Sequence, residues 1–233
     1  MVKVKICGLT RLDDARVAVG AGADYLGFIL YPPSPRAIAP DDAADLIDQL
    51  RASLTPAADQ ALAPGPWPLT PLFIGVFVNE PPATVATILD RCGLDLAQLS
   101  GDEPAADVID PASPLFGRAY KALRPRSLAE ADEGVARFAA PPGSTTSPRL
   151  LLDTPHGHLY GGTGETGDWG LAAAVAARLP GLMLAGGLTP DNVAAAVAAV
   201  RPFAVDVAGG VERAPGIKDA DRVRAFIANA KAD

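Results

Sequence analysis

Short apolar runs recur along the chain and alternate with longer segments whose apolar positions follow a helical spacing. Such runs are typical of β-strands, and the segments between them are Ala-rich and amphipathic, as expected of helices. We therefore predict eight strands, at residues 2–6, 25–30, 72–78, 94–99, 119–123, 150–152, 182–185 and 204–207.

Three of the helical segments carry recognisable signals at their N-terminal ends. Asp13 lies three residues after a threonine, which is the spacing of a capping box. Pro190 suits the first position of a helix, where its missing N–H costs nothing. The three predicted helices and their N-cap residues are 11–21 after Thr10, 190–200 after Thr189, and 220–230 after Asp219.

The alternation of strand and helix, at roughly 29 residues per unit, predicts a (β/α)₈ TIM barrel as a single domain over residues 1–233. The alternative is a doubly wound open sheet, but no GxGxxG motif follows the first strand. Two stretches without apolar periodicity, near residues 54–71 and 141–148, predict surface insertions. We see no linker long enough to separate two domains.

Composition narrows the classes of function. With 49% hydrophobic and 20% charged residues, the chain can bury a sizeable core, and its net charge of −7 disfavours a nucleic-acid partner. Cys7 and Cys92 are too few for a disulfide framework, and neither belongs to a CxxC metal motif. No signal-peptide core or membrane-spanning run is present, so we expect a cytoplasmic protein with no membrane partner.

Candidate chemistry collects where the predicted strands end, which is where TIM barrels build their active sites. The Gly186–Gly187 and Gly209–Gly210 pairs follow the seventh and eighth predicted strands. Loops at these two positions commonly bind phosphate through backbone N–H groups. Tight turns without any ligand explain the glycines equally well, so both interpretations stay open at this point.

A series of motifs in fixed order resembles one enzyme family. They are KICGLT, a loop ending SPR, GVFVN, QLSGDE, LLDTP, GGTGETGDW, LAGGLTPDNV and DVAGGVE followed by PGIKD. Together they resemble the phosphoribosylanthranilate isomerase family over residues 5–219. The resemblance implies an Amadori rearrangement of N-(5-phosphoribosyl)anthranilate to 1-(2-carboxyphenylamino)-1-deoxyribulose 5-phosphate, in tryptophan biosynthesis, without cofactor or metal.

The resemblance implies two catalytic groups. Cys7 in KICG would be the general base that removes the C2 proton, and Asp153 in LLD would be the general acid that protonates the ring oxygen. An ordinary thiol is mostly protonated at pH 7, so Cys7 needs a nearby donor or cation. Without the resemblance, Cys7 could be a core residue and Asp153 an N-cap. Cys92 lies in no motif and is predicted to be structural.

The same resemblance implies substrate-binding residues. Arg36 would bind the anthranilate carboxylate, and its alternative is a solvated loop arginine. Asp206 would bind substrate hydroxyls or the amino group, and its alternative is a buried carboxylate paired with a lysine such as Lys5. The substrate would thus be a small molecule that carries a phosphate and a carboxylate. The glycine-rich loop that would serve as a lid, or only as a flexible connector, contains Gly161, Gly162 and Gly164.

Some features depart from the family pattern or stay open. Ser100 stands where QLHG is usual, and Ala208 and Gly209 replace the two serines of DVSSGVE, which predicts weakened phosphate contacts. His156 and His158 lack other ligands at metal-binding spacing, so we interpret them as exposed loop residues. Their role, and whether the protein is a monomer or a homodimer, stay open.

Two rival functions remain. The sister indole-glycerol-phosphate synthase would require catalytic lysines and glutamates, but Lys3, Lys5, Lys121 and Glu103 do not form its motifs. A non-catalytic or differently specific phosphosugar-binding barrel is the other alternative. The presence of both Cys7 and Asp153 argues against it.

Overall fold

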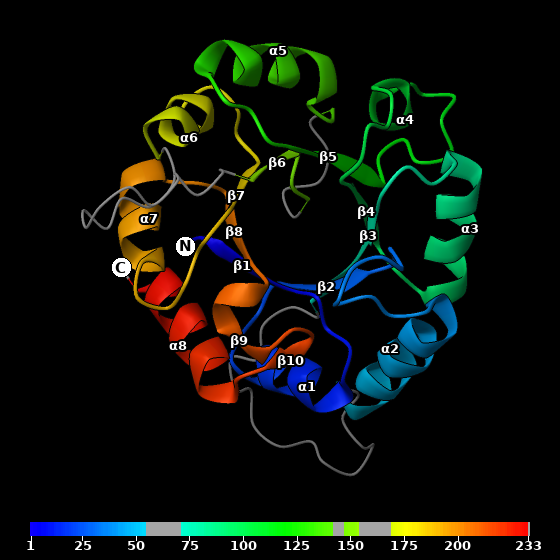
Figure 1. Cartoon of the computed structure of the whole chain (residues 1–233). Helices are drawn as coiled ribbons and strands as arrows, with labels where there is room; N and C mark the ends of the chain where they lie inside the picture. The colour runs from blue at the N-terminus through cyan, green and yellow to red at the C-terminus, as the bar shows by residue number, and fades with distance from the viewer. Residues whose placement is uncertain (55–70, 142–146, 154–168, 233) are drawn as a thin grey trace.

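The computed structural model describes residues 1–54, 71–141, 147–153 and 169–232. Eight parallel strands follow one another in sequence order and close into a barrel, because β8 pairs with β1 (Figure 1). The predicted TIM barrel is thereby confirmed. The strands are β1 Lys3–Cys7, β2 Tyr25–Ile29, β3 Leu72–Phe77, β4 Leu96–Leu99, β5 Ala119–Leu123, β6 Leu150–Asp153, β7 Leu182–Ala185 and β8 Ala204–Val207.

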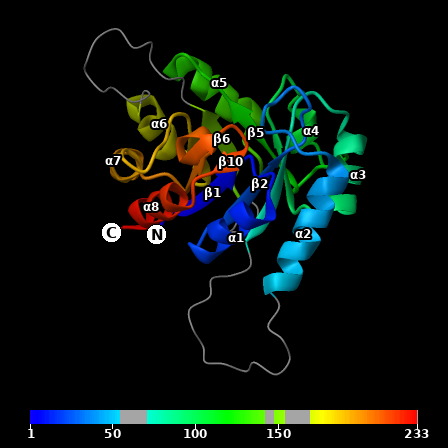
Figure 2. The same ribbon diagram turned by 60° about the horizontal axis from the view of Figure 1, so that its bottom comes forward.

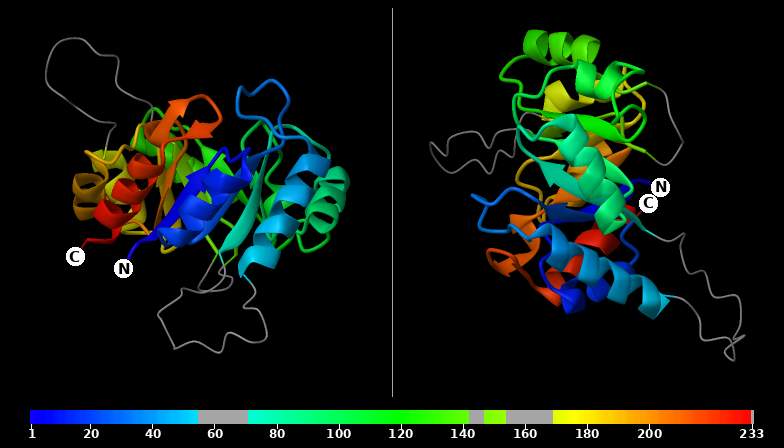
Figure 3. Two further views of the ribbon diagram at one scale, coloured as in Figure 1. Left: turned by 90° about the horizontal axis from the view of Figure 1, so that it is seen from below. Right: turned by 90° about the vertical axis from the view of Figure 1, so that its right-hand side faces the viewer.

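In the described ranges, eight α-helices surround the barrel wall, and the two chain ends lie close together beside α8 (Figures 2 and 3). Between β8 and α8 the chain forms a 3₁₀ turn, η1 Gly209–Val211, and a small hairpin of β9 Glu212–Ala214 and β10 Ile217–Lys218. The helices are α1 Leu12–Gly20, α2 Pro40–Leu54, α3 Pro82–Cys92, α4 Ala106–Ile109, α5 Leu128–Phe138, α6 Trp169–Ala176, α7 Val193–Val200 and α8 Ala220–Lys231.

The strands are buried on both faces, which explains their nearly continuous apolar sequence. Outward-facing side chains pack against the helices, whereas Tyr25, Tyr120 and Met183 belong to a separate apolar cluster. Lys5 and Gln98 are also buried. Because buried polar groups require partners, both side chains must be paired inside the barrel.

Two of the three predicted N-cap residues are wrong. Helix α1 begins after Arg11, and Thr10 instead donates its hydroxyl to the Gly216 carbonyl at 2.7 Å, which ties the first loop to the β9–β10 hairpin. Helix α7 begins at Val193 rather than Pro190, after a turn in which the Asn192 side chain accepts from the Thr189 N–H.

The third predicted helix start is confirmed. The Asp219 carboxylate accepts from the backbone N–H groups of Asp221 and Arg222 at the start of α8. The two predicted insertions fall mainly on residues outside the described ranges, so they stay a prediction. Cys92 is buried at the end of α3 and its thiol contacts the Pro40 carbonyl, as a packing residue would. Among the described helices, none is long and apolar enough to cross a membrane.

Candidate active site

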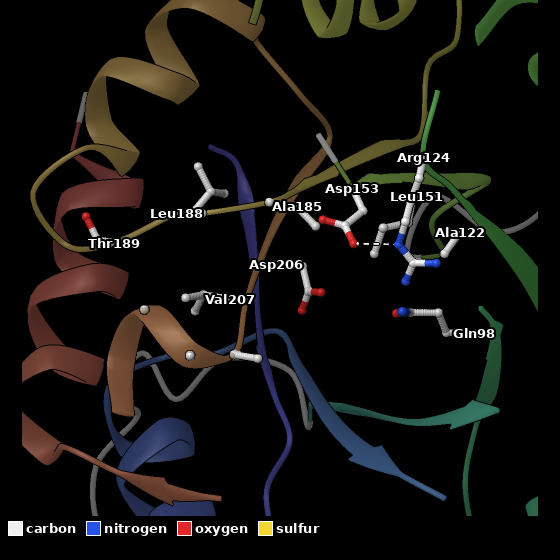
Figure 4. Close-up of a pocket in the computed structure, with 15 residues that line it drawn as sticks. Gln98, Ala122, Arg124, Leu151, Asp153, Ala185, Leu188, Thr189, Asp206 and Val207 are labelled. Carbon is white, nitrogen blue, oxygen red and sulfur yellow. Dashed lines mark hydrogen bonds and ion pairs between the residues drawn. The ribbon is translucent and has the colours of Figure 1, made fainter. Parts of the chain in front are cut away.

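A cavity of about 400 Å³ opens at the carboxyl ends of β4 to β8 (Figure 4). Cys7 and Arg36 do not line it, although the residues that do include most of the predicted site. Those predicted residues are Asp153, Asp206, Gly186, Gly187, Gly209 and Gly210. The fold therefore brings residues from β6, β7 and β8 to one space.

The two glycine pairs form one wall of this cavity, and glycine suits the two pairs for different physical reasons. Gly186 and Gly187 have φ angles of 94° and 57°, which favour glycine over residues with a side chain. A Cβ on Gly210 would lie 3.0 Å from the carbonyl carbon of Leu188 and overlap its oxygen. The loops after β7 and β8 thus pack backbone against backbone, and the wall between them consists largely of main-chain atoms.

Lys5 occupies the floor of the site and is fully buried. Its ammonium donates to Gln98 Oε1 at 2.8 Å and forms an ion pair with Asp206 Oδ1 at 3.1 Å. Tyr120 donates its hydroxyl to the same Gln98 oxygen. The alternative considered for Asp206, a carboxylate paired with Lys5, is therefore present, yet Asp206 also lines the cavity. The two roles do not exclude each other.

Burial sets the protonation of this cluster. Burial raises the pKa of Asp206, and the Lys5 ammonium opposes this only in part. Burial alone would lower the pKa of Lys5, but the Asp206 carboxylate and Cys7 outweigh it and raise that pKa above its ordinary value. Lys5 therefore stays protonated at neutral pH and supplies a fixed positive charge.

Cys7 ends β1 and is buried beside this charge. A Cβ on Gly27 would lie 2.8 Å from the Cys7 sulfur and 3.0 Å from Lys5 Cε, so both side chains lie over this glycine of β2. Burial raises the pKa of the Cys7 thiol, while Lys5 opposes the shift by its charge and by a hydrogen bond. The cation that a thiol base requires is thus present, although the thiol form is favoured in this structure.

Arg36 is held by an ion-pair network instead of extending into solvent. Its Nε donates to both oxygens of Glu212 at 2.9 Å, and its Nη2 donates to Glu212 at 2.8 Å. The alternative of a solvated loop arginine is therefore wrong. Burial would raise the pKa of Glu212, but hydrogen bonds from Arg36 and Lys218 outweigh it and lower that pKa. The Nη2 atom lies 3.2 Å from where a Cβ on Gly209 would stand.

Lys218 connects this network to Cys7. Its buried ammonium donates to Glu212 at 2.8 Å, to the Cys7 carbonyl at 2.6 Å and to the Ala208 carbonyl at 3.1 Å. Sequence reasoning missed Glu212 and Lys218, although both lie within quoted motifs, GVE and PGIKD. The sequence feature that could have indicated them is an acidic and a basic residue in two motifs that lie close together in the chain.

Asp153 ends β6, and its side chain is 36% exposed. Its Oδ2 accepts from Arg124 Nε at 3.0 Å, and Arg124 Nη1 donates to the Ser100 carbonyl at 3.3 Å. Arg124 directly follows β5 and was also missed, although every residue that follows a barrel strand is a candidate by position. Ser100 accepts from Gln98 Nε2 at 3.2 Å, so the residue at the place of the usual histidine contacts a cavity residue.

Several predicted features lie outside the described residues. These are His156, His158 and the glycine-rich loop with Gly161, Gly162 and Gly164. Within the described part of the chain, no group of three or more His, Cys, Asp or Glu residues could hold a metal ion.

A closed (β/α)₈ barrel with glycine loops after β7 and β8, and an acidic group and a thiol nearby, is typical of barrel enzymes that act on phosphosugars. The profile of the N-(5'phosphoribosyl)anthranilate (PRA) isomerase family matches residues 4–229. The chain belongs to this family, which confirms the predicted family and isomerase class.

Individual relatives agree along the whole chain. The N-(5'-phosphoribosyl)anthranilate isomerase of Geobacter sulfurreducens is 47% identical and that of Trichlorobacter lovleyi is 45% identical, over at least 98% of each chain. The crystal structure of dimeric phosphoribosylanthranilate isomerase from Thermotoga maritima, studied as monomers, superposes with a TM-score of 0.76 at 35% identity and 99% coverage of both chains. A phosphoribosylanthranilate isomerase in complex with reduced 1-(o-carboxyphenylamino)-1-deoxyribulose 5-phosphate superposes with a TM-score of 0.73 at 34% identity and 99% coverage of both chains.

Proposed function

We propose that this chain isomerises N-(5-phosphoribosyl)anthranilate to 1-(2-carboxyphenylamino)-1-deoxyribulose 5-phosphate through the residues of this cavity. The step belongs to tryptophan biosynthesis and requires no cofactor or metal. The observation that carries the proposal is the position of Asp153 and the glycine loops around one cavity, directly above the buried Lys5–Asp206 pair and Cys7.

Two proton transfers define the mechanism. Asp153 acts as the general acid toward the furanose ring oxygen, so that the C1–O bond breaks and a Schiff base forms with the anthranilate nitrogen. The Cys7 thiolate then removes the proton from C2, and the electron pair moves toward the iminium carbon to give an enolamine. Tautomerisation of the enolamine yields the aminoketose, so the reaction is redox-neutral overall.

Lys5 and Asp206 make the base chemically possible. The Lys5 ammonium hydrogen-bonds to Cys7 and stabilises the thiolate that burial disfavours. Asp206 holds this ammonium in place at 3.1 Å. Because Asp206 also faces the cavity, it can accept a hydrogen bond from the amino group or a hydroxyl of the substrate.

The two anionic ends of the substrate require separate partners. The Gly186–Gly187 and Gly209–Gly210 loops are the candidate phosphate site, because their main-chain wall lets N–H groups approach an anion closely. Arg36 is the candidate for the anthranilate carboxylate. Its Nε and Nη2 atoms contact Glu212, and the Nη1 edge can bind a carboxylate.

We also propose a lid over the site and a cellular location for the protein. The loop containing Gly161, Gly162 and Gly164 would close over the substrate. We place the protein in the cytoplasm, as a monomer or homodimer acting on a small molecule, without nucleic-acid or membrane partners. Two unpaired cysteines suit a reducing compartment.

A fluorescence assay tests the function. Phosphoribosylanthranilate is generated in situ, and addition of the protein should accelerate the loss of its fluorescence, with the aminoketose identified by mass spectrometry and NMR. Binding of the substrate without turnover would instead favour the non-catalytic phosphosugar-binding barrel.

A further inference from the structure

Glu212 is buried at the start of the β9–β10 hairpin, between two basic side chains. Its Oε1 accepts from Lys218 Nζ at 2.8 Å and from the Gly216 N–H at 3.2 Å. Its Oε2 accepts from Arg36 Nη2 at 2.8 Å, and the Glu212 side chain is 5% exposed. Because donors of the protein occupy both oxygens, Glu212 acts through its partners and not by direct contact with a ligand.

Lys218 anchors this carboxylate to the barrel. A lysine ammonium has three N–H donors. Those of Lys218 go to Glu212 at 2.8 Å and to the carbonyls of Cys7 at 2.6 Å and Ala208 at 3.1 Å. The two carbonyls belong to the main chain at the end of β1 and directly after β8. The position of the Glu212 carboxylate is therefore fixed relative to the strand that carries Cys7.

Glu212 holds Arg36 along one edge of its guanidinium. The carboxylate takes the Nε and Nη2 side, which leaves the end formed by Nη1 and the second Nη2 N–H for a ligand. A Cβ on Gly8 would lie 2.9 Å from Arg36 Cδ, so the stem packs over the glycine that follows Cys7. The Nη2 atom lies beside Gly209, which lines the cavity and has no side chain that could cover this atom.

The charges of this network favour a further anion. Two cations share one carboxylate, so Arg36, Lys218 and Glu212 together carry one net positive charge. Burial would raise the pKa of Glu212, but hydrogen bonds from the two cations outweigh it and lower that pKa, so Glu212 is ionised at neutral pH. A guanidinium edge that is fixed in this way can donate two parallel N–H bonds to a second carboxylate.

We propose that Glu212 is the positioning residue of the carboxylate subsite. It holds one edge of the Arg36 guanidinium so that the other edge faces the ring carboxylate of the substrate, and Lys218 fixes this arrangement relative to Cys7. The proposal rests on the proposed isomerase function. Within the substrate, covalent bonds limit the separation between the ring carboxylate and C2. A carboxylate subsite held at a constant distance from Cys7 therefore brings C2 to the thiol.

The first experiment measures the binding of anthranilate and of inorganic phosphate by calorimetry, which does not depend on turnover. Glu212→Gln keeps the size of the side chain, but one amide oxygen cannot accept from both cations. We expect this oxygen to stay with Lys218, because its side chain is 1% exposed against 26% for Arg36 and an unpaired buried ammonium costs more. The Kd for anthranilate should then rise about two- to tenfold, since the ligand must order a released arginine. The Kd for phosphate should not change.

A double-mutant cycle tests whether Glu212 acts through Arg36. Arg36→Met should raise the Kd for anthranilate about ten- to hundredfold, and the addition of Glu212→Gln should cause no further loss. In turnover, the loss in each single variant should fall on KM and not on kcat. The proposal is wrong if the two losses multiply, if Glu212→Gln leaves anthranilate binding unchanged or strengthens it, or if Arg36→Met binds anthranilate like the wild-type protein.

Glu103→Gln provides a matched control. Glu103 is also a buried carboxylate and pairs with the buried Lys121 at 2.7 Å, but its other donors are N–H groups of the loops after β3 and β4. This variant should lower the Tm, because it breaks a buried ion pair, and leave anthranilate binding unchanged. An equal loss of anthranilate affinity in Glu103→Gln would reduce the effect of Glu212→Gln to destabilisation and overturn the proposal.

Arg36→Lys keeps the proposal testable if Glu212→Gln does not fold. A lysine ammonium has no second edge to present while Glu212 holds it, so this variant should bind anthranilate nearly as weakly as Arg36→Met. Wild-type affinity in Arg36→Lys would show that an oriented planar group is not needed, and the proposal would fall. The fluorescence assay measures turnover separately: its absence in the wild-type protein would refute the isomerase function, whereas the binding measurements test the role of Glu212.

Discussion

Because the loops after β7 and β8 approach each other closely, we predict that Gly210→Ala forces them apart. A Cβ at this position would stand 3.0 Å from the Leu188 carbonyl carbon and overlap the carbonyl oxygen. Ordinary contacts of Cβ atoms begin near 3.4 Å, and both obstructing atoms are backbone, so no rotamer change relieves the overlap. The two loops must therefore move apart.

The expected magnitude follows from this displacement. Overpacking of this kind costs about 1–3 kcal/mol of stability, which lowers the Tm by about 2–4 °C for each kcal/mol in a domain of this size. A misplacement of about 1 Å in a binding group can cost about a hundredfold in rate. Because both loops contribute to the candidate phosphate site, we expect kcat/KM to fall by about ten- to hundredfold and inhibition by inorganic phosphate to weaken.

The neighbouring glycine provides the control. A Cβ on Gly209 would lie 3.2 Å from Arg36 Nη2 and 3.9 Å from Glu212 Oε2, both of which are ends of side chains that can shift. Gly209→Ala should therefore retain a nearly normal Tm, since the two loops need not move apart. Thermal melts and phosphate inhibition measured on both variants test whether the Gly210 substitution displaces the loops. If Gly210→Ala keeps wild-type phosphate inhibition, the glycine loops do not form the phosphate site.

Four further predictions concern the proposed chemistry. Cys7→Ser should abolish turnover while analogue binding and the Tm stay nearly normal, since an alkoxide forms far less readily than a thiolate; near-normal turnover would remove Cys7 from the base role. Because burial raises the pKa of Cys7, its alkylation by iodoacetamide should increase with pH to a midpoint above the ordinary value of about 8.5; a midpoint below that value would contradict this. Inorganic phosphate should compete with substrate and EDTA should have no effect, whereas loss of activity on chelation would point to a metal. Arg36→Met should raise KM about ten- to hundredfold with little change in kcat, because the carboxylate keeps its charge throughout; an unchanged KM would exclude the contact.

Much of the fold could be predicted because each buried strand is an apolar run of its own. Three predicted strands, at 119–123, 182–185 and 204–207, coincide with β5, β7 and β8. The fourth was predicted to begin at Leu94, which is buried but precedes β4, where its N–H bonds to Leu89. Burial alone does not distinguish a strand from the turn that leads into it.

The helix cap predicted at Thr10 failed because its side chain has a partner far away in the chain. Thr10 matches a capping box locally, but its hydroxyl bonds to Gly216, 206 residues away. No local pattern contains this information. The cap at Asp219 succeeded because its partners, the next turn's own N–H groups, are determined by the local sequence.

The site was only partly predictable because some of its contacts join residues that lie far apart in the chain. Motifs placed Asp153, Asp206 and the glycines at strand ends, and the fold gathered them. The partner of Asp206 depends on barrel closure, which sets Lys5 opposite Asp206 in the register of β1 and β8. Arg124 belongs to no motif, so only the closed barrel shows that it contacts Asp153.

The buried ion pairs hold the loop after β8 in place at the point where its sequence departs from the family pattern. Buried salt bridges contribute little net stability, so their value here lies in holding atoms in position. Lys218 bonds to the backbone carbonyls of Cys7 and Ala208, and these contacts do not depend on the side chain at 208. The loop after β8 therefore keeps its place beside β1 without the two serine hydroxyls. We therefore expect Ala208→Ser and Gly209→Ser to change phosphate affinity and to leave the architecture of the loop unchanged.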